Sequence, residues 1–142
     1  MTLVVFLARL AMARVFFVSG QTKVAGPEVF GVIIPTSVTS STFFLFEYEY
    51  NLPVISPVIA AYAATIAEHL LPVLLVLGLG TRFATVALVV MTLVIQWVYP
   101  DAWWNIHMWW ALVLMFIISW GPGVLSIDHL IHKSRARGGR GL

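Results

Sequence analysis

Residues 54–79 read VISPVIAAYAATIAEHLLPVLLVLGL, and the single carboxylate in this run is Glu68. A helix needs about 20 apolar residues to cross the hydrocarbon core of a bilayer, so this run predicts a membrane-spanning helix. Pro57 falls in its first turn, where a missing N–H costs little. Pro72 falls in its interior, where we expect it to kink the helix.

Three further apolar runs extend the same interpretation to the rest of the chain. Of the 142 residues, 61% are apolar and 10% are charged, whereas about a quarter of residues in soluble domains carry charge. We therefore predict an all-α integral membrane four-helix bundle, with one transmembrane domain over residues 1–132 and a basic tail over 133–142. The other three spans are expected at about 3–21, 83–99 and 105–125.

Lysine and arginine in short flanks predict the orientation of the spans. Cytoplasmic flanks are enriched in these residues, and the tail contains Lys133, Arg135, Arg137 and Arg140. An even number of spans then places both termini in the cytoplasm and makes the long connection 24–53 an outer loop. We expect the tail to be disordered. We interpret the aromatic segment 43–50 (FFLFEYEY) as an interfacial anchor, or alternatively as a lid over a quinone headgroup.

Two charged residues lie where lipid should not tolerate them. At about 1.5 Å per residue, Arg14 and Glu68 each lie about 16 Å from the inner ends of the first two spans, so we predict that they pair. Ala60, Ala64 and Glu68 share one helix face, and the small residues allow a neighbouring helix close to it. The pair would either be a structural clasp or, together with His69, form a buried polar pocket that binds a quinone oxygen or passes a proton.

A second candidate site lies near the outer ends of the third and fourth spans. Gln96, His107 and Trp110 are expected there among further tryptophans. One interpretation is an interfacial aromatic belt with a solvated histidine. The other is a shallow ligand site for an amphipathic ring that accepts hydrogen bonds from Gln96 and His107.

Several chemistries find no support in the residues. The chain has no cysteine, which excludes thiolate-ligated metal centres and disulfide exchange. His129 and His132 lie beside Asp128, but these are too few ligands to predict a metal site. The net charge of +2 arises from the tail and not from a basic face, so we expect no nucleic-acid partner.

The order of three motifs resembles the DoxX family of small four-helix bacterial membrane proteins. The similarity extends from about Ala8 to Leu130, and its motifs are Arg14 with residues 16–23 (FFVSGQTK), Glu68 with residues 75–82 (LVLGLGTR), and residues 121–128 (GPGVLSID). The resemblance implies a multi-pass protein of the bacterial inner (plasma) membrane. It also implies soluble or membrane redox partners.

Several functions remain open on this basis. The first is an accessory, non-catalytic and quinone-associated subunit of a membrane redox complex, with no intrinsic cofactor and with quinone as its ligand. If the chain is an enzyme, it would be a quinone-linked oxidoreductase. The alternatives are a small transport bundle, a membrane bundle that binds lipid or another small molecule, and a purely structural scaffold. Each of them would allow an oligomer.

Overall fold

The computed structural model describes residues 1–138, and within them four helical segments are long and apolar enough to cross a membrane. These spans cover Thr2–Gln21, Pro57–Leu77, Thr81–Val98 and Pro100–Trp120. The all-α, four-span prediction is therefore confirmed, with boundaries shifted by a few residues. The fourth span starts earlier than predicted, at Pro100. It also ends earlier, because Gly121 has a φ of 82° and ends the helix there.

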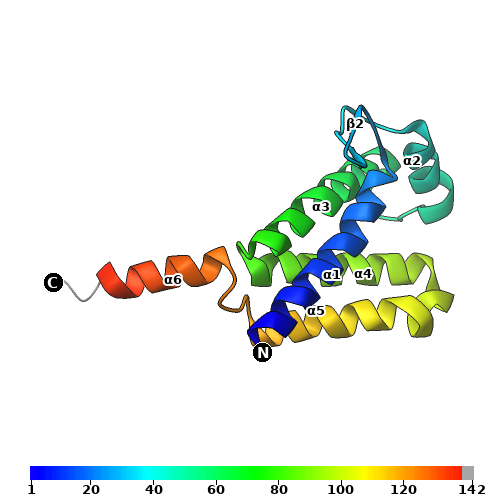
Figure 1. Cartoon of the computed structure of the whole chain (residues 1–142). Coiled ribbons are helices and arrows are strands. Elements are labelled where there is room, and N and C mark those ends of the chain that lie inside the picture. Colours follow the sequence, from blue (N-terminus) through cyan, green and yellow to red (C-terminus); the bar gives the residue numbers. More distant parts are fainter. Residues whose placement is uncertain (139–142) are drawn as a thin grey trace. The chain divides into compact units, whose positions relative to one another are not determined.

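The first three spans are single helices, and the fourth contains three segments (Figure 1). The spanning helices are α1 (Thr2–Gln21), α3 (Pro57–Leu77), α4 (Thr81–Val98) and, in the fourth span, η2 (Pro100–Ala102), η3 (Trp103–His107) and α5 (Met108–Trp120). Pro57 is the first residue of α3, and the Ser56 hydroxyl accepts a hydrogen bond from the Ile59 N–H. Pro72 lies inside α3, which continues past it.

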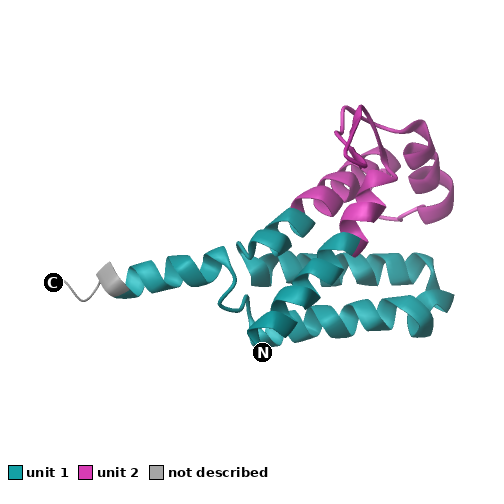
Figure 2. Ribbon diagram, viewed as in Figure 1, with its two compact units in different colours: residues 1–14, 71–142 teal, residues 15–70 magenta. Residues whose placement is uncertain are grey.

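The chain divides into two compact units, Met1–Arg14 with Leu71–Leu142, and Val15–Leu70 (Figure 2). Within the first unit, α4 and α5 lie side by side, joined by η2 and η3 (Figure 1). This unit ends in α6 (Ile127–Gly138). The expected disorder of the tail is therefore wrong for residues 133–138, while Arg140 lies outside the described residues.

The second unit contains the long connection between α1 and α3, which is folded. It consists of two short antiparallel strand pairs followed by the helical segments α2 (Ser40–Phe44) and η1 (Leu45–Tyr50). The strands β1 (Val24–Ala25) and β4 (Ser37–Val38) pair around a smaller hairpin of β2 (Glu28–Val29) and β3 (Val32–Ile33). Phe30 and Gly31 both have positive φ, which is the requirement of a tight two-residue hairpin turn.

The aromatic segment 43–50 belongs to a small core as well as to the surface. Phe46 is buried against Ala60 and Ala61 of α3, with Phe43 and Tyr50 packed beside it. The expectation of an interfacial anchor is therefore wrong for Phe46, because the small alanines of α3 leave room for its ring.

Candidate functional site

A buried ion pair lies at the base of the folded connection in the 15–70 unit. The Lys23 Nζ donates to the Glu68 Oε2 at 2.7 Å, and the two side chains are only 7% and 4% exposed. The same ammonium donates to the backbone carbonyl and the hydroxyl of Ser19, one turn earlier in the chain. All three ammonium protons are thus engaged, which offsets much of the cost of burying the charge.

The prediction that Arg14 neutralises Glu68 is wrong. The Glu68 carboxylate binds Lys23, and the Arg14 side chain is exposed. Counting helix rise alone favoured Arg14 because it ignored the length of the side chain of Lys23, which follows the end of α1 at Gln21. The alanine stripe was interpreted correctly: Ala60 and Glu68 are buried and Ala64 is half-buried.

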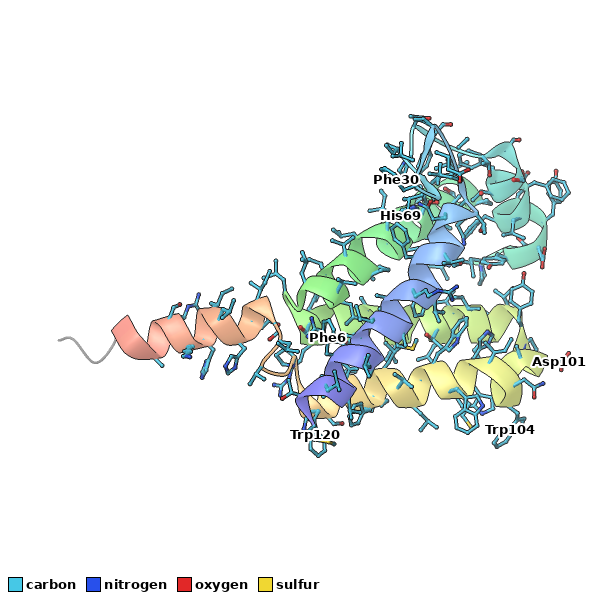
Figure 3. The ribbon with its side chains drawn as sticks, viewed as in Figure 1. Phe6, Phe30, His69, Asp101, Trp104 and Trp120 are labelled. Atoms are coloured by element: carbon cyan, nitrogen blue, oxygen red, sulfur yellow. The ribbon has the colours of Figure 1, made fainter. Side chains whose placement is uncertain are left out.

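His69, which is labelled in Figure 3, belongs to a second polar network in the same unit. Its Nδ1 lies 2.7 Å from the Thr65 carbonyl oxygen, and its Nε2 lies 3.0 Å from the Gln21 Nε2. The Gln21 Oε1 accepts the Ile33 N–H at 2.6 Å, which fixes the amide so that its NH2 faces the imidazole. Because a carbonyl can only accept, Nδ1 carries the proton and Nε2 accepts from Gln21. The ring therefore links α3 to Gln21 of α1, and Gln21 in turn binds β3.

Gly20 permits this arrangement. A Cβ at position 20 would lie 2.9 Å from two atoms of the His69 ring and 3.1 Å from the Glu68 Cβ. Only a residue without a side chain allows the end of α1 to approach His69 and Glu68 so closely.

A pocket of about 360 Å³ lies beside these networks, and we name it the loop pocket. Its polar lining consists of four hydroxyl-bearing residues and its apolar lining of four others: Thr36, Ser37, Tyr62 and Thr65, and Val24, Pro35, Val38 and Ile66. Thr65 is also the residue whose carbonyl accepts the His69 proton. The loop pocket thus shares a wall with the His69 network.

The second predicted cluster does come together, in the other unit. The Gln96 Oε1 accepts a hydrogen bond of 2.6 Å from the Nδ1 of the buried His107, and the rings of His107 and Trp110 are 5.2 Å apart. The Gln96 amide group donates to the Pro100 carbonyl at 2.9 Å. These hydrogen bonds tie the end of α4 to the start of the fourth span.

Sequence reasoning missed a buried polar cluster of this unit, which is centred on Arg9. This arginine is 1% exposed. Its guanidinium donates to the carbonyls of Leu75 and Val76 in the last turn of α3, and to those of Pro122 and Leu125 after α5, at 2.7–2.8 Å. We call these residues the Arg9 junction. A cation is well placed there because the last carbonyls of a helix lack intrahelical partners.

Asp128 joins α6 to the start of α4 beside the Arg9 junction. Its two carboxylate oxygens accept the N–H groups of Gly80 and Thr81 at 2.8 and 2.9 Å. Desolvation raises the pKa of Asp128, but these N–H donors and the Arg9 cation outweigh it, so the pKa lies below its ordinary value. Asp128 therefore caps α4 from a distant part of the chain.

The signals for the missed residues were weak but present. Lys23 lies three residues after Gly20, just beyond the end of α1. It was therefore a second basic residue within reach of Glu68. Arg9 lies in the first half of its span, and its guanidinium lies beside Gly78 of the GLG turn 78–80. Its partners are backbone carbonyls, which no side-chain pattern reveals.

The four spans define the protein as a multi-pass membrane protein. A family model described as DoxX matches residues 4–101, more than half of the chain, and the chain therefore belongs to the DoxX family. The match ends at Asp101, short of the extent to Leu130 that the resemblance suggested, and leaves out residues 121–128. No curated protein and no solved structure matches the chain.

Proposed function

We propose that the protein is a quinone-associated accessory subunit of a membrane redox complex, and that the loop pocket holds the quinone headgroup. The observation that carries this proposal is the chemistry of the loop pocket. A quinone headgroup is a flat apolar ring with two carbonyl acceptors, so it needs apolar walls and a few hydrogen-bond donors. The loop pocket offers both kinds of lining within about 360 Å³, inside the range of small-molecule sites.

Two hydroxyl groups of the loop pocket are free to donate. Within residues 1–138, the side-chain hydroxyls of Ser37 and Tyr62 have no hydrogen-bond partner, whereas those of Thr36 and Thr65 donate to the carbonyls of Ala25 and Ala61. A quinone carbonyl could therefore accept from Ser37 or Tyr62 without breaking an existing hydrogen bond.

Access from the lipid supports the same ligand. Ile66, in the pocket wall, is 60% exposed, and Ile59 and Tyr62 on the same face of α3 are exposed as well. Because α3 is a candidate span, this face meets acyl chains, and the isoprenoid tail of a quinone would lie along it. The protein's part is to bind and orient the quinone, while electrons would come from a redox partner.

The test measures quinone in the full-length protein purified in mild detergent. Copurified quinone is extracted and identified by mass spectrometry, and binding of added ubiquinone-1 is titrated. Ile66→Trp, which fills the loop pocket, should lower bound quinone by about tenfold. The matched control Ile59→Trp lies on the same exposed face but outside the pocket, and it should bind like the wild type.

Two outcomes would refute the quinone assignment. The first is a wild-type protein that neither copurifies with quinone nor binds ubiquinone-1. The second is equal binding by the Ile66→Trp and Ile59→Trp proteins, which would mean that quinone associates with the lipid-facing surface in general.

We further propose that the protein resides in the bacterial plasma membrane with both termini in the cytoplasm. The support is the basic character of the C-terminal flank, including Lys133 and Arg135 of α6, since cytoplasmic flanks carry more lysine and arginine.

A further inference from the structure

We propose a second binding site, distinct from the loop pocket, for the phosphate group of an anionic phospholipid. It is a pocket of about 580 Å³ beside the Arg9 junction, which we name the junction pocket. All of its lining residues belong to the unit formed by residues 1–14 and 71–142.

The junction pocket lies where several spans end. It is lined by Val5 near the start of α1, by Arg82 and Phe83 in the first turn of α4, and by Trp120, the last residue of α5. Figure 3 shows Trp120 at this end of α5. The ends of membrane-spanning helices lie at the depth of lipid headgroups. The anion most abundant at that depth is the phosphate of a phospholipid.

Three side chains of the lining can bind a phosphate oxygen. Arg82 comes from α4, and His129 and His132 come from α6. Within residues 1–138, none of these three side chains has a hydrogen-bond or ion-pair partner. An arginine can bind a phosphate through two parallel hydrogen bonds, and each imidazole can donate one.

The acidic residue of the lining does not neutralise this site. Asp128 also borders the junction pocket, but its two carboxylate oxygens accept the N–H groups of Gly80 and Thr81. The guanidinium of Arg82 is therefore left without a carboxylate partner in the described residues, and its charge is available to an external anion.

The apolar part of the lining favours a lipid over a free anion. Phe83 is 73% exposed and Trp120 is 56% exposed, at the level where acyl chains meet headgroups. An inorganic phosphate ion gains nothing from such side chains. The glycerol and first methylenes of a phospholipid can pack on them while the phosphate reaches Arg82.

The test compares two lipids that have the same acyl chains and a different headgroup charge. Full-length protein is stripped of lipid in detergent, and dioleoyl phosphatidylglycerol or dioleoyl phosphatidylcholine is titrated while binding is followed by native mass spectrometry. We expect phosphatidylglycerol to bind about tenfold more tightly than phosphatidylcholine. The double variant Arg82→Gln/His132→Gln should weaken phosphatidylglycerol binding by about tenfold, as the loss of charge-assisted hydrogen bonds requires.

The matched control is Arg135→Gln. Like Arg82→Gln, it removes one arginine charge, but Arg135 is an exposed residue of α6 outside the lining of the junction pocket. It should therefore leave phosphatidylglycerol binding within about twofold of the wild type. Arg82 and His132 are exposed, so the double variant should retain its folded yield, and His132→Gln alone provides a milder second variant with the same direction of effect.

Three results would overturn the proposal. Equal losses in the Arg135→Gln and double variants would show diffuse attraction to α6 instead of a site. Equal binding of the two lipids would show that the junction pocket does not select an anionic phospholipid. Arg82-dependent thermal stabilisation by inorganic phosphate, without any by phosphatidylglycerol, would assign the site to a free anion.

Discussion

Lys23 and Glu68 each carry a buried formal charge, and each charge would be costly to bury without the other. Lys23→Met leaves the Glu68 carboxylate without its 2.7 Å partner, and we expect a loss of stability of about 3–5 kcal/mol. Adding Glu68→Gln to it should recover part of this loss, because neither charge then remains. Reversible unfolding in mixed micelles measures both.

The control for this pair is Lys133→Met, which removes a lysine that is exposed on α6 and should change stability by less than about 0.5 kcal/mol. Additive effects of Lys23→Met and Glu68→Gln would contradict a direct interaction between the two side chains.

Arg9 and Arg14 lie on the same helix, but we expect their substitution to change stability by very different amounts. Arg9→Leu removes the guanidinium that donates to the carbonyls of Leu75, Val76, Pro122 and Leu125. We expect the free energy of unfolding to fall by more than about 3 kcal/mol. Arg14→Leu removes an exposed charge and should cost less than about 0.5 kcal/mol. Equal melting temperatures of the two variants would contradict the Arg9 junction.

Asp128 predicts a pH dependence of stability. Its pKa is lower in the folded protein than the ordinary value of 3.8, so the charged form stabilises the fold above pH 3.8 and this contribution is lost as the pH falls through the folded pKa. The stability difference between wild type and Asp128→Asn should therefore shrink as the pH is lowered from 6 towards 3. A difference that stays constant over this acid titration would show that the carboxylate charge does not contribute.

At the scale of elements, the turn between α3 and α4 contains two glycines that differ in how closely other residues approach them. Gly78 and Gly80 have φ values of 67° and 57°. A Cβ at Gly78 would lie 2.5 Å from the Arg9 Nη2 and from the Ser126 Cβ, whereas a Cβ at Gly80 meets nothing within 4 Å. Gly80→Ala should therefore cost about 1–2 kcal/mol of backbone strain, and Gly78→Ala clearly more.

The comparison of these two variants is made by thermal unfolding in one detergent. If Gly78→Ala is no more destabilising than Gly80→Ala, the close approach of Arg9 and Ser126 to the turn is not needed for stability.

The elements were predictable to different degrees from the sequence. Long apolar runs with glycine or proline at their ends predicted the four spans, because a helix that crosses a bilayer needs about 20 predominantly apolar residues. The fold of 24–53 was not predicted, since its strands are two residues each and its helical part packs through contacts distant in sequence, such as Phe46 with Ala61. α6 was missed because its basic residues suggested a disordered tail, although Ser126 accepts the His129 N–H at its start.

The sequence predicted which residues belong to the candidate sites better than it predicted which of them contact each other. Gln96 and His107 were expected together and do form a hydrogen bond. Glu68 was expected to have a cationic partner, but the partner is Lys23. Side-chain length and backbone carbonyl acceptors decide such choices, and neither is visible in hydrophobic periodicity.

At the scale of the whole molecule, the absence of cysteine makes the orientation directly measurable. Single cysteines at Glu47→Cys and Ser134→Cys occupy exposed positions on opposite sides of the membrane in a four-span chain. With both termini cytoplasmic, a membrane-impermeant maleimide should label position 47 in intact spheroplasts and position 134 only after permeabilisation. The reverse pattern would invert the proposed orientation.

The Arg9 junction also has a consequence for synthesis. Arg9 leaves the ribosome 113 residues before Pro122 and 116 residues before Leu125, which supply two of its carbonyl partners. The nascent α1 therefore carries an incompletely satisfied guanidinium until Leu125 has been translated. A translocon or an insertion chaperone would have to shelter it for that interval, and chains that stall before residue 122 would be natural targets for membrane proteases.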